Sequence, residues 1–186
     1  MLKKQGLRAY IKESVAVSMC TAMIVISSWL SIPFAVSFTL QTLAIFTVSA
    51  LFKFRISFSS VALYILIGLC GLPVFSGFTG GPSALVGPTG GFIIGFLLIP
   101  VIIKCFGAKR KLMLAVSMLA ALLLCYTVGT IWYTVMYAGI TLEGCLSALA
   151  VCVLPFIIPD ILKIALAVLL WSRLKNTVKL SDLRRK

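Results

Sequence analysis

The sequence predicts an all-α integral membrane protein with six transmembrane helices, a glycine-rich outer lid loop and a short extra outer helix. The whole chain, residues 1–186, is expected to form a single polytopic membrane domain. Three observations support this prediction: the chain is 61% hydrophobic, its mean hydropathy is +1.16, and its charged residues fall in short clusters between apolar runs. Such a composition excludes an ordinary soluble domain.

Six apolar runs are candidate spans, because a helix needs about 20 apolar residues to cross the hydrocarbon core. The first run follows a basic segment and lacks a clear small-residue cleavage site, which favours a retained helix over a removed signal peptide. The second and third runs are short, the fourth follows a glycine-rich loop, the fifth is the longest, and the sixth begins near Pro159, which suits a first helical turn. The expected spans are residues 13–31, 38–52, 56–72, 88–104, 112–138 and 156–174.

The extra helix is expected from Leu142 to Leu154, between Gly139 and Pro155. Its length does not suffice for a full span, so we place it at the outer interface or in a long outer loop. Thr141 is a candidate cap for this helix, and Glu143 supplies a favourable negative charge near its start.

The basic residues support the six-span count. All of them except Lys163 fall on one side of a six-span protein, and the positive-inside rule makes that side, with both termini, cytoplasmic. The net charge of +13 follows from this loop bias and from attraction to the lipid bilayer, so no nucleic-acid partner is expected. The basic side collects Lys3, Lys4, Arg8, Lys12, Lys53, Arg55, Lys104, Lys109, Arg110, Lys111, Arg173, Lys175, Lys179, Arg184, Arg185 and Lys186.

The composition excludes most catalytic chemistry. The chain has no histidine and no Cys-x-x-Cys pair, so neither a metal site nor a catalytic residue is expected. A two-aspartate intramembrane protease would need a second buried carboxylate, whereas Glu13 and Asp182 map to the cytoplasmic ends and Glu143 lies outside. The Gly-Lys-Ser/Thr ending of a phosphate-binding loop is also absent. We therefore expect a protein without enzymatic activity, nucleotide site or cofactor.

Asp160 and Lys163 are the most informative residues, because only here do opposite charges occur inside an apolar run. A charge near the bilayer centre costs roughly 2.5 to 3.5 kcal/mol on insertion scales, so an intramembrane pair is by default a functional-site hypothesis. Their i, i+3 spacing puts both on one helix face, about 20 Å and 15 Å from the cytoplasmic end. The alternative is a salt bridge that only locks this helix to a neighbour.

The loop over residues 71–91 contains seven glycines and three prolines, which exclude a regular helix. Phe75 and Phe78 are too apolar for a free linker, so the loop is expected to fold onto the bundle as a lid. Its backbone N–H groups are suited to hold a carboxylate. An ordinary glycine-rich connection is the alternative.

Polar side chains also occur near the outer end of the second span, at Thr39, Gln41 and Thr42. Buried amides and hydroxyls need hydrogen-bond partners, which a ligand or a neighbouring helix would supply equally well. Four aromatic residues are instead interpreted as packing residues or interfacial anchors, namely Trp29, Tyr64, Trp132 and Tyr133.

Small residues recur at every fourth position of the first span, at Ser14, Ser18 and Ala22. Gly91 and Gly95 form a similar pair in the fourth span. Such ridges permit close helix approach, either inside the bundle or against another membrane protein.

Five sequence blocks occur in a specific order along most of the chain. They are Ile32-Pro33-Phe34, Phe38-Thr39-Leu40-Gln41-Thr42-Leu43, Gly71-Leu72-Pro73-Val74-Phe75 with Gly80-Gly81, Gly87-Pro88-Thr89-Gly90-Gly91-Phe92, and Pro155-Phe156-Ile157-Ile158-Pro159-Asp160-Ile161-Leu162-Lys163. In these blocks the chain resembles the BioY family, the biotin-specific substrate-binding subunits (S components) of energy-coupling factor transporters.

The resemblance implies a six-helix subunit of the bacterial cell membrane that captures biotin from outside with high affinity. It further implies three partner subunits: a membrane coupling (T) subunit and two cytoplasmic ATPases. The family's docking motif on the first helix is usually Ala-x-x-x-Ala, and the nearest match here is Ser18-Met19-Cys20-Thr21-Ala22. Ser14, Ser18 and Ala22 are therefore the expected docking residues.

For the ligand, we expect Asp160 to accept from the ureido N–H groups of biotin and Lys163 to donate to the ureido oxygen. The carboxylate is expected near residues 87–90 or Thr42, and the reverse pose, with the carboxylate on Lys163, is the alternative. The expected substrate-binding residues are Asp160, Lys163, Gln41, Thr39, Thr42, Gly80, Gly81, Gly87, Thr89, Gly90, Phe75 and Phe78. Two alternatives stay open, namely a subunit of the same architecture for another vitamin or precursor, and a purely structural membrane protein.

Overall fold

The structure, a computed structural model, describes residues 2–32, 38–107 and 110–175, with side chains described from Tyr10 onward. Pro33, Phe34, Lys109 and the basic tail 176–186 lie outside the described residues. The elements in chain order are α1 (Leu2–Trp29), β1 (Ser31–Ile32), β2 (Phe38–Thr39), α2 (Gln41–Leu51), α3 (Phe54–Leu69), η1 (Ser76–Phe78), α4 (Pro82–Val86), α5 (Gly90–Gly95), α6 (Leu98–Phe106), α7 (Lys111–Tyr133), the π-helical turn η2 (Thr134–Ala138), α8 (Leu142–Cys152), η3 (Leu154–Phe156) and α9 (Ile157–Leu174).

The helices fall on the six apolar runs, and the all-α membrane fold class is confirmed. Three stretches are long and apolar enough to cross a membrane, Tyr10–Trp29, Lys111–Ala138 and Leu142–Leu174. The other three runs form shorter apolar helical stretches, Gln41–Leu51, Phe54–Leu69 and Gly90–Phe106, the last of which contains both α5 and α6. The exact count of six spans stays a prediction.

The second span begins later than predicted. Phe38 and Thr39 form a short antiparallel ladder with Ser31 and Ile32, and the helix starts at Gln41. The ladder gives hydrogen-bond partners to the backbone groups of Phe38 and Thr39, which would otherwise need to join the helix.

The fourth predicted span, residues 88–104, is two short helices rather than one. Pro100 explains the break between α5 and α6, because it has no N–H for the Phe96 carbonyl and its ring crowds that carbonyl. The N–H of Ile99 donates to the Phe96 oxygen instead, at 3.3 Å. Irregular backbone of this kind survives in a membrane protein only where protein covers it or it lines a cavity.

The predicted outer helix is present as α8. The side chain of Thr141 accepts the N–H of Gly144 at 3.0 Å, and Glu143 lies in the first turn. Gly139 precedes the helix with φ 81°, a left-handed conformation that a residue with a Cβ adopts only with strain. Cap, charge and glycine together start the helix where the sequence predicted.

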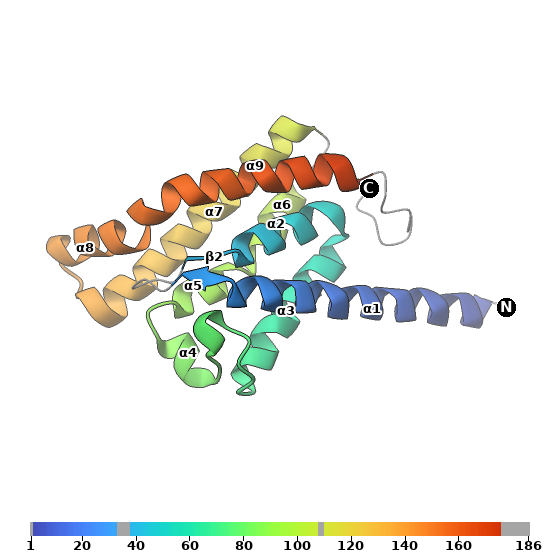
Figure 1. Ribbon diagram of the computed structural model, residues 1–186, viewed down its shortest axis with the longest axis horizontal. Helices are drawn as coiled ribbons and strands as arrows, with labels where there is room; N and C mark the ends of the chain where they lie inside the picture. The colour runs from blue at the N-terminus through green and yellow to red at the C-terminus, as the bar shows by residue number, and fades with distance from the viewer. Residues whose placement is uncertain (1, 33–37, 108–109, 176–186) are drawn as a thin grey trace.

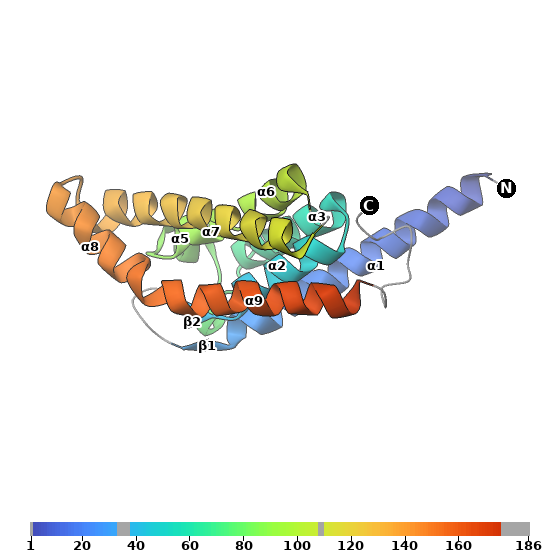
Figure 2. The same cartoon turned by 90° about the horizontal axis from the view of Figure 1, so that it is seen from above.

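The longest helices, α1, α7 and α9, extend along the long axis of the molecule, whereas α3 crosses it (Figure 1). α7 and α9 run beside each other and are joined at one end by α8, while α2 packs against both α1 and α9, and α5 and α6 pack on α7 (Figure 2). The α2–α3 turn, the end of α6 and the C-terminal end of α9 lie toward the N-terminal end of α1 (Figure 1). This is the end that carries the described basic residues other than Lys163.

The core lies where α2, α3, α6 and α7 meet, and its largest fully buried side chains include Tyr64, Phe46 and Met118. The outward faces are also apolar, as Ile158 on α9 (81% exposed) illustrates. Exposed apolar surface on this scale marks a membrane-facing protein, because lipid replaces water around it.

Candidate functional site

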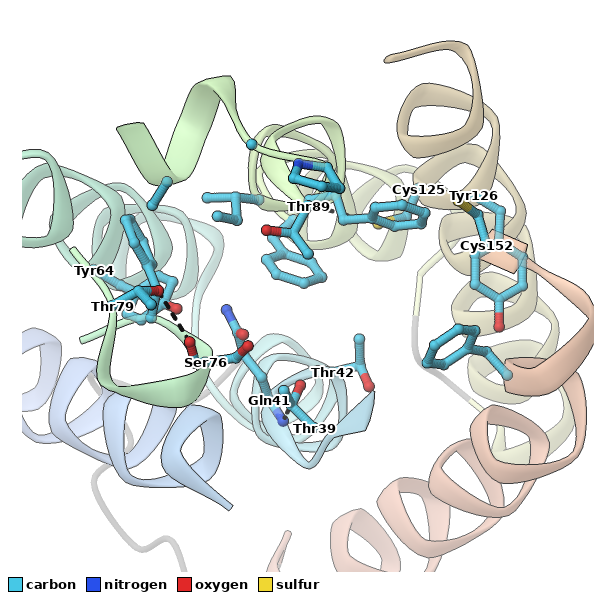
Figure 3. Close-up of a pocket in the computed structure, with 18 of the residues that line it drawn as sticks. Thr39, Gln41, Thr42, Tyr64, Ser76, Thr79, Thr89, Cys125, Tyr126 and Cys152 are labelled. Atoms are coloured by element: carbon cyan, nitrogen blue, oxygen red, sulfur yellow. Dashed lines mark hydrogen bonds between the residues drawn. The ribbon is translucent and has the colours of Figure 1, made fainter. Parts of the chain in front are cut away.

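One cavity of about 550 Å³ lies among α2, α3, α5, α7, α9 and the glycine-rich loop. Its volume is within the range typical of small-molecule sites, about 300 to 1,000 Å³. Figure 3 shows side chains converging on it from several elements, with Tyr64 on one side and Tyr126 on the other. Its wall also contains apolar side chains, among them Phe92, Phe96 and Leu122.

Asp160 and Lys163 line this cavity, and both are nearly inaccessible to solvent, at 3% and 4% exposure. The Lys163 ammonium donates to Asp160 Oδ1 at 2.7 Å. Tyr126 on α7 donates its hydroxyl proton to Asp160 Oδ2 at 2.5 Å. Each carboxylate oxygen therefore has one charge-assisted hydrogen bond and keeps a lone pair for a further donor.

Phe38 completes the surroundings of the charged pair. Its ring lies beneath the Lys163 ammonium, with Nζ 4.2 Å from the ring centroid, and it stacks on Phe156 at 6.4 Å. The face of an aromatic ring attracts a cation electrostatically, and only one of the three N–H donors of the ammonium bonds to Asp160. Lys163 thus retains protons for a ligand acceptor, while its charge is balanced by Asp160.

A second polar group of atoms borders the same cavity. Gln41 Nε2, Thr42 Oγ1 and Tyr64 OH are buried and, within the described chain, have no hydrogen-bond partner. Gln41 and Ser28 are the polar neighbours of the Tyr64 hydroxyl, yet neither is in hydrogen-bond geometry. Unpaired buried polar atoms each cost about 1 to 3 kcal/mol, so these three need a partner that enters the cavity. Tyr64 is therefore more than the packing residue that the sequence suggested.

The glycine-rich loop covers the cavity as predicted and is held from two sides. On one side, α1 supplies Ser28 Oγ, which donates to the Val74 carbonyl at 2.5 Å, and Trp29 Nε1, which donates to the Pro73 carbonyl at 2.8 Å. On the other side, Trp132 Nε1 donates to the Gly87 carbonyl at 3.1 Å. Both tryptophans thus position the lid rather than serving only as interfacial anchors.

Within the lid, Phe75 is 2% exposed and meets the Tyr64 ring edge-on at 5.4 Å. The ring of Phe75 fills the space beside Gly68, where a Cβ would overlap it. Gly80 is required for a similar reason, because a Cβ there would collide with the Leu72 carbonyl. These close approaches bring the lid backbone down onto the mouth of the cavity.

Nine of the twelve sequence-predicted site residues line the cavity, and three do not. Phe78 is 63% exposed and stacks on Trp29 outside, Gly81 forms the turn before α4, and Gly90 packs against the Leu85 backbone. The nine that line it are Thr39, Gln41, Thr42, Phe75, Gly80, Gly87, Thr89, Asp160 and Lys163.

Sequence reasoning missed several lining residues, above all Tyr126, together with Cys125 and Cys152. Tyr126 is 34 residues from Asp160, so no spacing rule connects them. Its hydroxyl inside an apolar run was the available signal, since a buried tyrosine O–H needs a partner.

The Ser14, Ser18 and Ala22 ridge lies on the exposed face of α1. The neighbouring small residues Ala16 and Cys20 are buried, at 7% and 5% exposure. The ridge is therefore exposed along α1, while its neighbours make the contact inside the bundle.

Fold and site together define a class: a multi-pass membrane protein with a lid-covered cavity for a small polar ligand. Comparisons with known proteins narrow this class. The chain belongs to the BioY family, whose model matches residues 2–180. "Biotin transporter BioY" of Thermotoga maritima is 33% identical over 89% of this chain and 96% of its own length.

Two further known proteins are similar to this chain. "Probable biotin transporter BioY" of Pyrococcus horikoshii is 33% identical over 89% of this chain and 97% of its own length. A solved structure described as the S-component for biotin from an ECF-type ABC transporter superposes with a TM-score of 0.77. It is 27% identical and covers 90% of this chain and 92% of that chain.

Proposed function

We propose that this chain is the high-affinity biotin-binding subunit of an energy-coupling factor uptake transporter in the bacterial cell membrane. The observation that carries the proposal is the buried Asp160–Lys163 pair in the wall of a lid-covered cavity. Family membership supports the ligand, because the relatives that match nearly the whole chain are named biotin transporters.

The chemistry of the pair suits the ureido ring of biotin, which has two N–H donors and one carbonyl acceptor. Asp160 accepts from the ureido N–H groups, and Lys163 donates to the ureido oxygen while it stays paired with the carboxylate. Phe92, Phe96 and Leu122 supply apolar contacts for the rest of the ligand. An analogue without these donors and this acceptor would leave polar atoms of Asp160 and Lys163 without hydrogen bonds and would therefore bind weakly.

Transport requires an energy source outside this chain, because the sequence has no phosphate-binding loop. We assign that role to a membrane coupling subunit and two cytoplasmic ATPases. The exposed ridge of Ser14, Ser18 and Ala22 on α1 supports docking to the coupling subunit, since small residues let two helices approach closely.

Calorimetric titration of the purified full chain with biotin tests the proposal. Wild type is expected to bind tightly, and Asp160→Ala and Lys163→Ala to bind at least about a hundredfold more weakly, because each removes a buried charged partner that hydrogen-bonds the ureido ring. Lys175→Ala, which removes a basic residue outside the cavity, is the matched control and should bind like wild type.

The outcomes separate the parts of the proposal. If both cavity variants bound biotin as tightly as wild type, the site assignment would be wrong. If wild type bound lipoate, thiamine or dethiobiotin in preference to biotin, the chain would serve another vitamin or precursor. An absence of any titration heat with these ligands would favour a purely structural protein.

A further inference from the structure

The cavity has two polar ends of different chemistry. Tyr126 marks one side in Figure 3, where it bonds to Asp160 of the charged pair. Tyr64 marks the opposite side, beneath the lid, and the Gln41 side chain points into the cavity from α2 (Figure 3). The end with Tyr64 and Gln41, called here the lid end, has only hydroxyl and amide groups.

A charge inventory distinguishes the ends further. Among the described residues that line the cavity, Asp160 and Lys163 are the charged ones, and each neutralises the other. The lid end instead has two donors without a partner in the described chain, Gln41 Nε2 and the Tyr64 hydroxyl. Both residues are buried, at 3% and 0% exposure. An anionic group placed there would meet hydrogen-bond donors but no cation.

We infer that the lid end holds the tail of the ligand, and that it recognises the tail as a hydrogen-bond acceptor rather than as an anion. The inference rests on the proposed function and deepens it. The chain therefore takes up the class of ureido-ring ligands that includes both the carboxylate and uncharged tails such as a primary amide.

The donor and acceptor inventory supports this breadth. A tyrosine hydroxyl donates or accepts, and a glutamine amide offers both kinds of atom, so the lid end satisfies a carboxylate and an amide alike. Bonds to a charged acceptor are stronger than neutral ones, yet the carboxylate loses more hydration on burial. These opposing effects hold the difference in affinity to about tenfold or less.

The reverse orientation fits the same atoms poorly. A ligand carboxylate on Lys163 would lie beside the Asp160 carboxylate, whose oxygens are already held at 2.5 Å by Tyr126 and 2.7 Å by Lys163. Two adjacent carboxylates repel each other and compete for the single Lys163 ammonium. The ureido ring brings N–H donors to Asp160 instead of a second negative charge.

The test compares biotin with biotin primary amide by calorimetric titration of the purified full chain. Wild type is expected to bind the two ligands with affinities within about tenfold of each other. An amide that binds more than about a hundredfold more weakly would overturn the inference, because that is the loss expected when a buried ion pair is broken. A wild type that does not bind biotin would instead overturn the proposed function on which the inference rests.

Two matched variants locate the tail, because each removes a single hydroxyl from opposite ends of the cavity. Tyr64→Phe should weaken biotin more than the amide and so change the ratio of the two affinities. Tyr126→Phe should weaken both ligands in the same proportion, since its hydroxyl acts through Asp160. A ratio that changes in Tyr126→Phe, or that stays unchanged in Tyr64→Phe, would contradict the assignment of the tail to the lid end.

Discussion

Asp160 is the residue on which the site depends, and its surroundings explain why a charge is tolerated there. Burying a carboxylate without partners is prohibitive, and here Lys163 and Tyr126 each engage one of its oxygens. Such a pair is weak evidence for stability, because the cost of removing two ions from water offsets their attraction. Its presence within an apolar helix therefore supports the binding role proposed for it.

This balance yields a prediction for the stability of the protein. Asp160→Leu alone should destabilise the fold by about 3 to 5 kcal/mol, because it leaves the Lys163 ammonium unpaired. The double variant Asp160→Leu, Lys163→Met should recover most of that loss, since both charges are gone and the volume is retained. Thermal unfolding in detergent measures both changes.

Biotin titration of the double variant provides the complementary measurement. A chain that unfolds near the wild-type temperature and no longer binds biotin would show that the pair serves the ligand rather than the fold. A double variant as unstable as Asp160→Leu would instead show that the ion pair itself stabilises the bundle.

At the scale of the elements, α1 has one buried face and one exposed face. Its buried face packs on α3, where Thr21 Oγ1 donates to the Ser60 carbonyl at 3.1 Å and Ser60 Oγ donates to the Val17 carbonyl at 3.3 Å. Its exposed face presents Ser18 and Ala22. Because the Trp29 end of the same helix also holds the lid, the proposed docking surface and the lid contacts lie on one helix.

The exposed ridge predicts which substitutions would prevent the proposed docking to the coupling subunit. Ser18→Leu and Ala22→Leu should block co-purification with the coupling subunit, because a large side chain prevents close helix approach. Biotin binding by the isolated chain should stay within about threefold of wild type, since neither residue lines the cavity. Co-purification of a tagged chain and calorimetric titration measure the two effects.

Met19→Leu is the matched control on the same helix, because Met19 is already large and is 69% exposed. It should leave both readouts unchanged. Normal complex formation by Ser18→Leu and Ala22→Leu would place the docking surface elsewhere.

For the whole molecule, the predicted orientation in the membrane is open to a direct test. Six spans with cytoplasmic termini put the end of α3 outside and the end of α6 inside. Each of these ends carries an exposed free cysteine, Cys70 after α3 and Cys105 near the end of α6.

These native cysteines predict a labelling pattern. In intact cells, a membrane-impermeant maleimide should react with a variant that keeps only Cys70 and should leave a variant that keeps only Cys105 unlabelled. Permeabilised cells should allow both reactions. The opposite pattern would invert the topology, and labelling of both in intact cells would contradict the single span, residues 88–104, predicted between the two cysteines.

Much of the fold could be predicted because its signals are local. Hydropathy located the apolar runs, and the cap at Thr141 and the first turn around Asp160 each depend on a few neighbouring residues. The break at Phe96 was missed because Pro100 is tolerated in many membrane helices when other groups satisfy the freed carbonyl. The ladder at Phe38 and Thr39 depends on a partner strand earlier in the chain, which hydropathy does not register.

The sequence by itself determined the membrane class, the one-sided distribution of basic residues and the presence of a charged pair on one helix face. These follow from composition and from spacings of a few residues, for which helix geometry dictates the outcome. Only the tertiary structure decided that Tyr126 bonds to Asp160, that Tyr64 and Gln41 turn unpaired polar atoms into the same cavity, and that Phe78 lies outside it. Those outcomes depend on contacts between segments distant in sequence, and such contacts are set by packing rather than by local pattern.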